Sequence, residues 1–327
     1  MKIGLWADNV NFPSLPMMKL SAYHKGRGDT VTLIDNFFER FDVAYCSKTF
    51  NLPAISKIPA LRFYPNADKT YYGGTGWAIE VEHGKEVYRS DSDPPLSREI
   101  EHIYPDYRLY PAYTENTAYG FLTRGCPNGC GFCIVSGKEG RGSVQTAELS
   151  EFWRGQKEIT LMDANLLARK DREHLIESLI ASKARIDYTQ GLDARFIDED
   201  TAKMLCRTKI KMAHFAFDLM KNEGAILRGL ALFRKHFKNT DRQCRVYILT
   251  NYDTTHAEDW YRVKKVVELG YSPDVRIYRK GTHDKFVTDL SRWANHSRIY
   301  RSCSFADYVP RADGRRCGEL YPDILSG

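Results

Sequence analysis

Three closely spaced cysteines are the residues of this chain best suited to chemistry. Cys126, Cys130 and Cys133 lie in the stretch FLTRGCPNGCGFC, residues 121–133, in the pattern C-x3-C-x2-C. Glycine and proline between them allow a tight loop in which all three sulfurs turn inward. Clustered thiolates are ligands of metal ions and of iron–sulfur clusters. The spacing therefore predicts a metal centre.

The number of thiolates distinguishes between the kinds of metal centre. A [4Fe–4S] cluster has four irons that each need a ligand, so three cysteines leave one iron open to an exogenous ligand. A structural zinc site needs four nitrogen or sulfur ligands, and the sequence near these cysteines offers neither a second C-x-x-C nor a histidine. Zinc and a purely structural cysteine loop stay open as alternatives to the iron–sulfur cluster.

The elements that must position this loop alternate between strand and helix patterns from Gly120 onward. Strands are predicted over residues 119–123, 158–163, 185–193, 211–218, 244–250 and 274–279, and helices over 172–184, 198–207, 223–237 and 257–270. This order predicts an α/β fold with an open or partial (β/α)6 barrel, in which chemistry lies on loops at the carboxyl ends of the strands. The first cysteine, Cys126, comes three residues after the first of these strands.

The cysteine stretch resembles the signature of the radical S-adenosylmethionine (radical SAM) enzymes, C-x3-C-x-aromatic-C. Phe132 stands in the aromatic position, and the lead-in TRG is frequent in that family. The resemblance implies that Cys126, Cys130 and Cys133 bind a [4Fe–4S] cluster and that SAM chelates the open iron. It also implies an external flavodoxin- or ferredoxin-like electron donor, and cleavage of SAM to methionine and a 5′-deoxyadenosyl radical that abstracts hydrogen from a substrate. No residue identifies that substrate.

Polar residues at the ends of the later strands are the candidates for binding SAM, because this cofactor carries an amino acid, a ribose and an adenine. In the family a glycine-rich motif follows the second strand, where this chain has LMDAN instead. Instead of binding SAM, Asp193 could cap the helix that begins near Asp198 or pair with Arg195. His214, at the end of the next strand, could be a half-buried residue whose hydrogen bonds are satisfied within the protein. The predicted cofactor contacts are Phe132, Asp163, Asn165, Gln190, Asp193, Arg195, Asp218, Thr250 and Asn251.

The first ninety residues predict a separate Rossmann-like domain. Strands over 2–8, 30–35 and 42–47 and a helix over 14–25 form a β-α-β unit that starts a parallel sheet. With the strand end GGTGW (73–77), the segment resembles the cobalamin-binding domain of one radical SAM subgroup. The cobalt-binding histidine of that subgroup's motif is missing from the loop 7–16, which holds Asp8 and Asn9. Binding of cobalamin stays open and would favour methyl transfer as the reaction. The favoured interpretation is a degenerate domain that shapes the substrate pocket and binds no cobalamin.

These patterns divide the chain of 327 residues into a Rossmann-like domain (1–90), a linker (91–118), the barrel (119–285) and a C-terminal extension (286–327). The run 290–308, which is rich in Arg, Tyr and Trp, can close the barrel or contact a substrate through cation–π and phosphate pairing, and packing is the favoured role. Of the other five cysteines, Cys46, Cys206 and Cys244 are predicted to be buried structural thiols. Whether Cys303 and Cys317 contribute to a second metal site stays open, since they have no further partner in sequence.

Composition and charge set limits on location and partners. The chain is 43% hydrophobic with a mean hydropathy of −0.49, has no segment that could cross a bilayer and begins without a signal sequence, so we expect a soluble cytoplasmic protein without a membrane partner. The net charge of +6 is concentrated partly in residues 234–245 and 276–285. Such runs bind nucleic acid or acidic partners, or are solvated surface. The alternative function is a non-catalytic metal-containing protein that binds nucleic acid.

Overall fold

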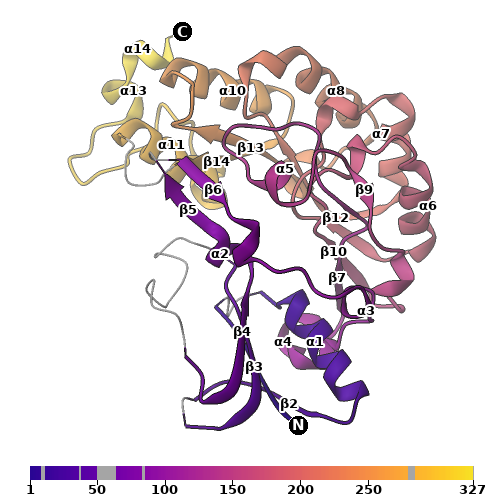
Figure 1. Cartoon of the computed structure of the whole chain (residues 1–327). Coiled ribbons are helices and arrows are strands. Elements are labelled where there is room, and N and C mark those ends of the chain that lie inside the picture. The colour runs from indigo at the N-terminus through magenta and orange to yellow at the C-terminus, as the bar shows by residue number, and fades with distance from the viewer. Residues whose placement is uncertain (9–11, 37, 50–63, 83–84, 279–283, 327) are drawn as a thin grey trace. The chain divides into compact units, whose positions relative to one another are not determined.

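The computed structural model describes the chain except for residues 9–11, 37, 50–63, 83–84, 279–283 and 327 (Figure 1). The chain divides into two compact units, Met1–Ala164 and Asn165–Gly327. Each unit contains parallel strands and helices, so the molecule is of the mixed α/β class that the sequence predicts. No helix of the described residues is long and apolar enough to span a membrane.

The first unit begins with a parallel sheet of four strands in the order β2-β1-β3-β4. The strands β1, β2 and β3 and the helix α1 confirm the predicted β-α-β unit, and β4 ends at Gly73, where a strand end was predicted. In α1, Met17 and Leu20 pack on Ile3 and Leu5 of β1, because alternate residues of a strand face the same side. The bounds are β1 (Lys2–Ala7), α1 (Leu15–Gly26), β2 (Thr30–Leu33), β3 (Phe41–Ser47) and β4 (Ala67–Gly73).

The rest of the first unit contains short elements around one parallel strand pair. The strand β7 pairs with β10 in parallel, and two antiparallel pairs are formed by β5 with β6 and by β8 with β9. The bounds are α2 (Thr75–Ala78), β5 (Ile79–Glu82), β6 (Lys85–Tyr88), α3 (Arg98–Glu101), α4 (Pro111–Thr114), β7 (Thr117–Gly120), β8 (Thr123–Arg124), α5 (Val135–Lys138), β9 (Val144–Gln145) and β10 (Glu158–Leu161).

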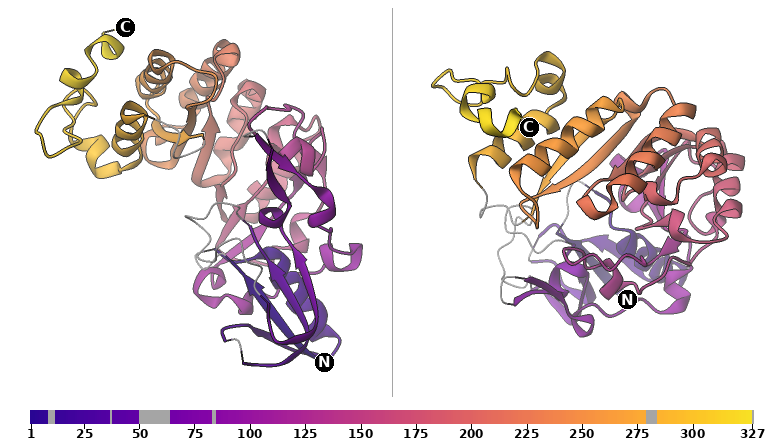
Figure 2. Two further views of the ribbon diagram at one scale, coloured as in Figure 1. Left: turned by 60° about the vertical axis from the view of Figure 1, so that its left-hand side comes forward. Right: turned by 90° about the horizontal axis from the view of Figure 1, so that it is seen from above.

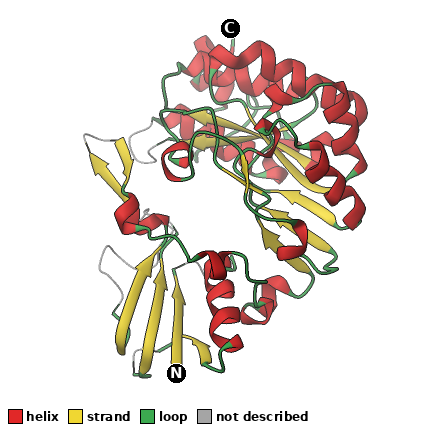
Figure 3. Cartoon of the chain, turned by 45° about the vertical axis from the view of Figure 1, so that its right-hand side comes forward, coloured by secondary structure: helices red, strands yellow, loops and turns green. Residues whose placement is uncertain are grey.

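The second unit alternates strands and helices along the chain. Figure 3 draws the helices of the chain in red and its strands in yellow. Its strands β11, β12, β13 and β14 pair in parallel in chain order, and the complete six-stranded sheet has the order β14-β13-β12-β11-β10-β7. The bounds are α6 (Glu173–Ser182), β11 (Arg185–Tyr188), α7 (Glu199–Arg207), β12 (Lys209–Ala216), α8 (Glu223–His236), α9 (Thr240–Gln243), β13 (Cys244–Thr250), α10 (His256–Glu268) and β14 (Ser272–Ile277).

All six strands and four helices predicted after Gly120 occur in the structure, with ends that differ by a few residues. The predicted strand over 185–193 is shorter than expected, because β11 ends at Tyr188 and the chain then turns. Residue 279, at the end of the last predicted strand, lies outside the described residues. A parallel sheet with intervening helices is thus confirmed, whereas its closure as a partial barrel and the boundaries at residues 90, 118 and 285 stay predictions.

The C-terminal segment packs through aromatic side chains. Trp293 and Phe305 are buried and their rings lie 5.4 Å apart, which confirms the packing role predicted for residues 290–308. The helix α11 packs on β14, and α14 packs on α10. Figure 2 shows this C-terminal segment in yellow. The bounds are α11 (Lys285–Asn295), α12 (Ser297–Ser302), α13 (Cys317–Leu320) and α14 (Pro322–Leu325).

Candidate metal centre

The three cysteines lie on the loop between β8 and α5, soon after the carboxyl end of β7. Cys126 and Cys130 are half-buried and Cys133 is exposed. The Cys126 backbone N–H donates a hydrogen bond to the Gly140 carbonyl at 3.1 Å, and the Cys133 N–H donates to the Cys130 carbonyl at 3.0 Å. The loop is therefore held at its first cysteine by the segment that follows it, and it turns tightly between its second and third.

Gly125, the residue before the first cysteine, is required by its surroundings. Its φ of +87° is unfavourable for residues with a side chain, and a Cβ would lie 2.1 Å from the Gly142 carbonyl oxygen. The Gly125 N–H donates to Glu139 Oε2 at 3.0 Å. The backbone at Gly125, just before the cysteine loop, thus lies in close contact with the segment 139–142 that follows the loop.

Asp163 holds the segment that leads into the loop. This buried carboxylate follows β10 and accepts hydrogen bonds from the Leu122 N–H at 3.0 Å, from the Thr123 N–H and from the Thr123 hydroxyl at 2.6 Å. Burial raises the pKa of Asp163 to about 6, and the hydrogen bonds from Thr123 and Leu122 limit that rise. Asp163 was predicted to contact SAM; the structure shows it bonded within the protein, and the SAM contact stays a prediction.

An ionic chain leads from the first helix to the cysteine loop. Lys19 of α1 donates to Glu101 Oε1 at 3.0 Å, and the same oxygen accepts from Arg124 at 3.2 Å. Arg124 also pairs with Glu139 at 3.5 Å and lies over the Phe121 ring, 4.0 Å from its centroid. Since Glu139 in turn accepts from Gly125, the chain of contacts ends one residue before Cys126.

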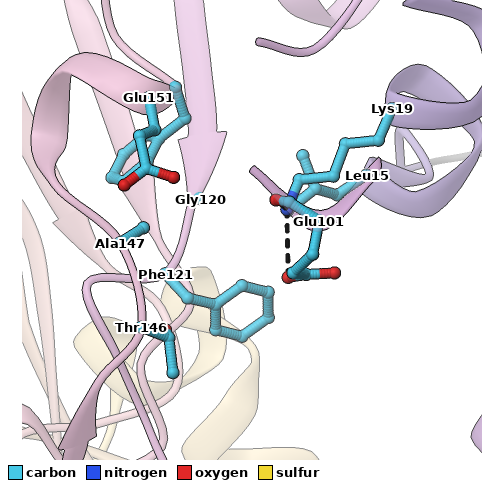
Figure 4. A pocket seen from close by; sticks show the side chains of 9 residues that line it. Leu15, Lys19, Glu101, Gly120, Phe121, Thr146, Ala147 and Glu151 are labelled. Carbon is cyan, nitrogen blue, oxygen red and sulfur yellow. Dashed lines mark hydrogen bonds and ion pairs between the residues drawn. The ribbon is translucent and has the colours of Figure 1, made fainter. Parts of the chain in front are cut away.

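A small cavity of about 20 Å³ lies beside this ionic chain (Figure 4). Figure 4 shows the Phe121 ring and the Lys19–Glu101 pair on its wall. Burial lowers the pKa of the Lys19 ammonium, and Glu101 opposes that effect. The cavity is lined by Leu15, Lys19, Glu101, Gly120, Phe121, Thr146, Ala147, Glu151 and Phe152.

A second connection joins the other end of the cysteine loop to the N-terminal segment. Lys138, at the end of α5, pairs with Asp93 at 3.2 Å and donates to the Thr75 hydroxyl. Asp93 also accepts from the Gly74 N–H at 2.8 Å and from the Tyr88 hydroxyl at 3.0 Å. The helix that follows Cys133 is therefore fixed to the turn that follows β4.

In the second unit, the predicted SAM contacts near β11 bond to one another. Asp193 accepts from Arg195 Nε at 2.8 Å and from Arg195 Nη2 at 2.7 Å, a bidentate pair. Asn165 is buried, donates to Asp193 at 3.1 Å and accepts from the Ala168 N–H. The alternative in which Asp193 pairs with Arg195 is thus confirmed, and Asp198 itself caps α7 by accepting from the Thr201 N–H.

The remaining predicted contacts lie near the ends of β12 and β13. Asp218 accepts from the Leu249 N–H at 3.0 Å, Thr250 donates to the Arg276 carbonyl, and Asn251 donates to the Tyr278 carbonyl. Burial raises the pKa of Asp218 to about 6. Gln190 is exposed, and Phe132, in the cysteine loop of the first unit, is half-buried.

His214 is half-buried, shares a hydrogen bond with the Tyr188 carbonyl and stacks on the Tyr247 ring, which confirms its alternative as a satisfied residue. Cys46 and Cys244 are buried as predicted, whereas Cys206 is only partly buried. Among the described residues, no three His, Cys, Asp or Glu side chains converge on a point where one metal ion could sit.

Sequence reasoning missed Lys19, Glu101 and Glu139 as residues that position the cysteine loop. The first two are distant from the cysteines in sequence, and single charged residues carry no periodic signal. Glu139 is six residues beyond Cys133, but only the fold brings it back to Gly125. No protein-family model matches this chain, and no curated protein matches it. The candidate site therefore depends on the residues described above.

Proposed function

We propose that the protein is a radical SAM enzyme that holds a [4Fe–4S] cluster on Cys126, Cys130 and Cys133 and binds SAM. The observation that carries this proposal is the C-x3-C-x-aromatic-C spacing on a loop soon after a parallel strand. In this proposal a Rossmann-like N-terminal domain precedes a partial (β/α)6 barrel. A bound cluster would supply the reductive cleavage of SAM that starts hydrogen abstraction from a substrate.

The cysteine loop has the properties that a cluster with three protein ligands requires. Each iron of a cubane binds its own thiolate, so the three sulfurs need not converge on one point as the ligands of a zinc ion do. The sulfur-bearing residues are at least partly accessible, and the loop contains Gly129 and Gly131, which impose no side-chain bulk. These features favour the cluster over a structural zinc site.

The chain's own residues position this loop. Asp163 binds the backbone at Leu122 and Thr123, and Glu139 binds the backbone at Gly125, so the chain before Cys126 is held at three points. Lys138 fixes the helix after Cys133. A preorganised ligand loop needs this kind of support from surrounding hydrogen bonds.

The direct experiment is anaerobic reconstitution of the full chain with iron and sulfide. We expect a brown protein with iron and sulfide bound, which releases 5′-deoxyadenosine from SAM when a strong reductant, or a flavodoxin- or ferredoxin-like donor, is added. Cys130→Ala is expected to abolish release, whereas Cys303→Ala, a control on a half-buried cysteine outside the loop, is expected to retain it.

Two results would overturn this proposal. One is a colourless protein that binds zinc stoichiometrically, as the alternative of a metal-containing nucleic-acid-binding protein requires. The other is undiminished release of 5′-deoxyadenosine by Cys130→Ala. Retention of hydroxocobalamin through gel filtration is a separate test, and it would direct the search for a substrate toward methyl transfer.

A further inference from the structure

The four-stranded sheet of the first unit has a topological switch point. Its order is β2-β1-β3-β4, so the chain moves from β1 to one side to form β2 and then crosses to the other side to form β3. In open parallel sheets, ligands bind outside the carboxyl ends of the two strands where the order reverses. Here these ends are Ala7 and Ser47, whose strands are direct neighbours.

Asp8, the first residue after β1, has an unsatisfied carboxylate oxygen at this edge. Its side chain is buried, with a relative exposure for the residue of 8%. Oδ1 accepts a hydrogen bond from the Thr49 N–H at 2.9 Å, across the end of β3. Oδ2 is buried without a hydrogen-bond partner in the described part of the chain. A buried carboxylate oxygen is costly to leave without a donor, so the site favours a ligand that supplies one, such as a hydroxyl group.

Lys48 and Trp77 provide hydrogen-bond donors at the same edge, where Asp8 provides an acceptor. Lys48 directly follows β3, is 6% exposed, and its ammonium lies 4.8 Å from the centroid of the Trp77 ring. The indole Nε1 of Trp77 is a second buried polar atom without a partner among the described residues. An ammonium and an indole N–H both bind anionic oxygens.

The turn after β4 brings Trp77 to the end of β3. Gly74 has a φ of +102°, and a Cβ there would lie 2.4 Å from the Lys48 carbonyl oxygen. The Lys48 carbonyl also accepts from the Gly76 N–H at 2.8 Å. The segment Ser47–Thr49 is thus bounded by Asp8 on one side and by the Trp77 turn on the other.

We propose that this edge of the N-terminal sheet binds a nucleoside monophosphate or a close analogue. The ribose hydroxyls would donate to Asp8 Oδ2, and the phosphate would accept from Lys48 and from the Trp77 indole. This assignment does not depend on the proposed radical SAM function. It does connect to the cysteine loop, because Asp93 binds both the Gly74 N–H and the Lys138 ammonium of α5.

Calorimetric titration of the full chain with AMP tests the assignment. The protein carries Cys126→Ala, Cys130→Ala and Cys133→Ala together, so that no site formed by a cluster and SAM contributes. We expect one AMP per chain. Asp8→Asn keeps the shape and the Thr49 contact but turns the unpartnered acceptor into a donor, and we expect it to weaken binding about tenfold or more. Trp77→Phe keeps the ring and is expected to weaken binding by a factor of about three to ten.

Matched control measurements separate binding at this edge from nonspecific binding of AMP. Asp91→Asn, at an exposed aspartate of the same unit, should leave the affinity unchanged, and circular dichroism checks that each variant is folded. If Asp8→Asn does not fold, Trp77→Phe alone decides. The proposal is overturned if AMP does not bind, if both variants bind it as tightly as their parent, if inorganic phosphate binds equally well, or if hydroxocobalamin binds in its place. Release of 5′-deoxyadenosine by the unmodified chain is measured separately, so each proposal can fail alone.

Discussion

The Thr123 hydroxyl donates a hydrogen bond to Asp163 Oδ1 at 2.6 Å, and both residues are buried. Asp163 follows β10, whereas Thr123 lies three residues before the first cysteine of the candidate metal centre. This contact joins the chain just after β10 to β8, the short strand that follows β7. It means that the position of the cysteine loop depends on the end of β10 as well as on β7.

Removing this hydroxyl tests that dependence. Thr123→Val keeps the shape of the side chain, and we expect it to lower the free energy of unfolding by about 1–2 kcal/mol, because a buried carboxylate loses one of its donors. The reconstituted variant should also lose iron faster during gel filtration. Urea denaturation and iron analysis measure the two effects. Thr208→Val, which removes a buried hydroxyl bonded to the Leu205 carbonyl, is the control. Equal iron loss from both variants would contradict a positioning role.

The Glu139 carboxylate is the second support of the loop, and two substitutions separate its contacts. Glu139→Gln loses the charge that pairs with Arg124 but retains an oxygen that can accept from the Gly125 N–H. Glu139→Ala loses both contacts. We expect Glu139→Gln to retain most of the iron and Glu139→Ala to lose most of it, since the ion pair is long, at 3.5 Å, and Arg124 keeps Glu101 as its other partner. Glu115→Ala, at an exposed position, is the control. Similar iron content in both Glu139 variants would argue against the backbone contact.

The strands and helices of this chain could be predicted because their apolar residues repeat with the period of the element. β13 has alternating buried residues, and α11 has a buried stripe of apolar residues. The cysteine spacing could be interpreted for a similar reason, since the three cysteines are local in sequence. The contacts of Lys19, Glu101 and Asp163 could not be predicted, because they join residues 23 to 82 positions apart. Asp193 and Arg195 lie after β11, but the sequence could not distinguish their pairing with each other from the binding of a cofactor.

Arg262 is a fully buried cation that binds the ends of β12 and β13. It donates to the carbonyls of Phe217, Asp218 and Leu249 at 2.8–2.9 Å and pairs with Asp259. We expect Arg262→Met to lower the free energy of unfolding by about 3–5 kcal/mol, because it leaves the Asp259 charge buried without its partner.

The double variant Asp259→Asn with Arg262→Met should recover part of this loss, since the unpaired charge is then gone. Urea denaturation of the single and double variants gives the comparison. If the losses of unfolding free energy from Asp259→Asn and Arg262→Met simply add in the double variant, the unpaired charge of Asp259 is not the cause of the instability of Arg262→Met.

Asp218 predicts a specific dependence of stability on pH. Burial raises its pKa to about 6, while the Leu249 N–H and Arg262 act in the opposite direction. In the unfolded chain the pKa of an aspartate is about 3.9. Between these values the folded protein holds a proton that the unfolded chain has lost, so the contribution of Asp218 to stability decreases as the pH rises from about 4 to about 6.

The variant Asp218→Asn does not titrate at this position and serves as the reference. Between pH 4 and pH 7, we expect the wild type to lose up to about 3 kcal/mol of unfolding free energy relative to Asp218→Asn, because two pKa units correspond to that difference. Asp163 has a similarly raised pKa, but it is present in both proteins and its contribution cancels. Urea denaturation at several pH values gives the difference directly. A difference that stays constant with pH, or one that increases in favour of the wild type, would show that the Asp218 carboxylate is stabilised by its hydrogen bond and by Arg262 more than burial destabilises it.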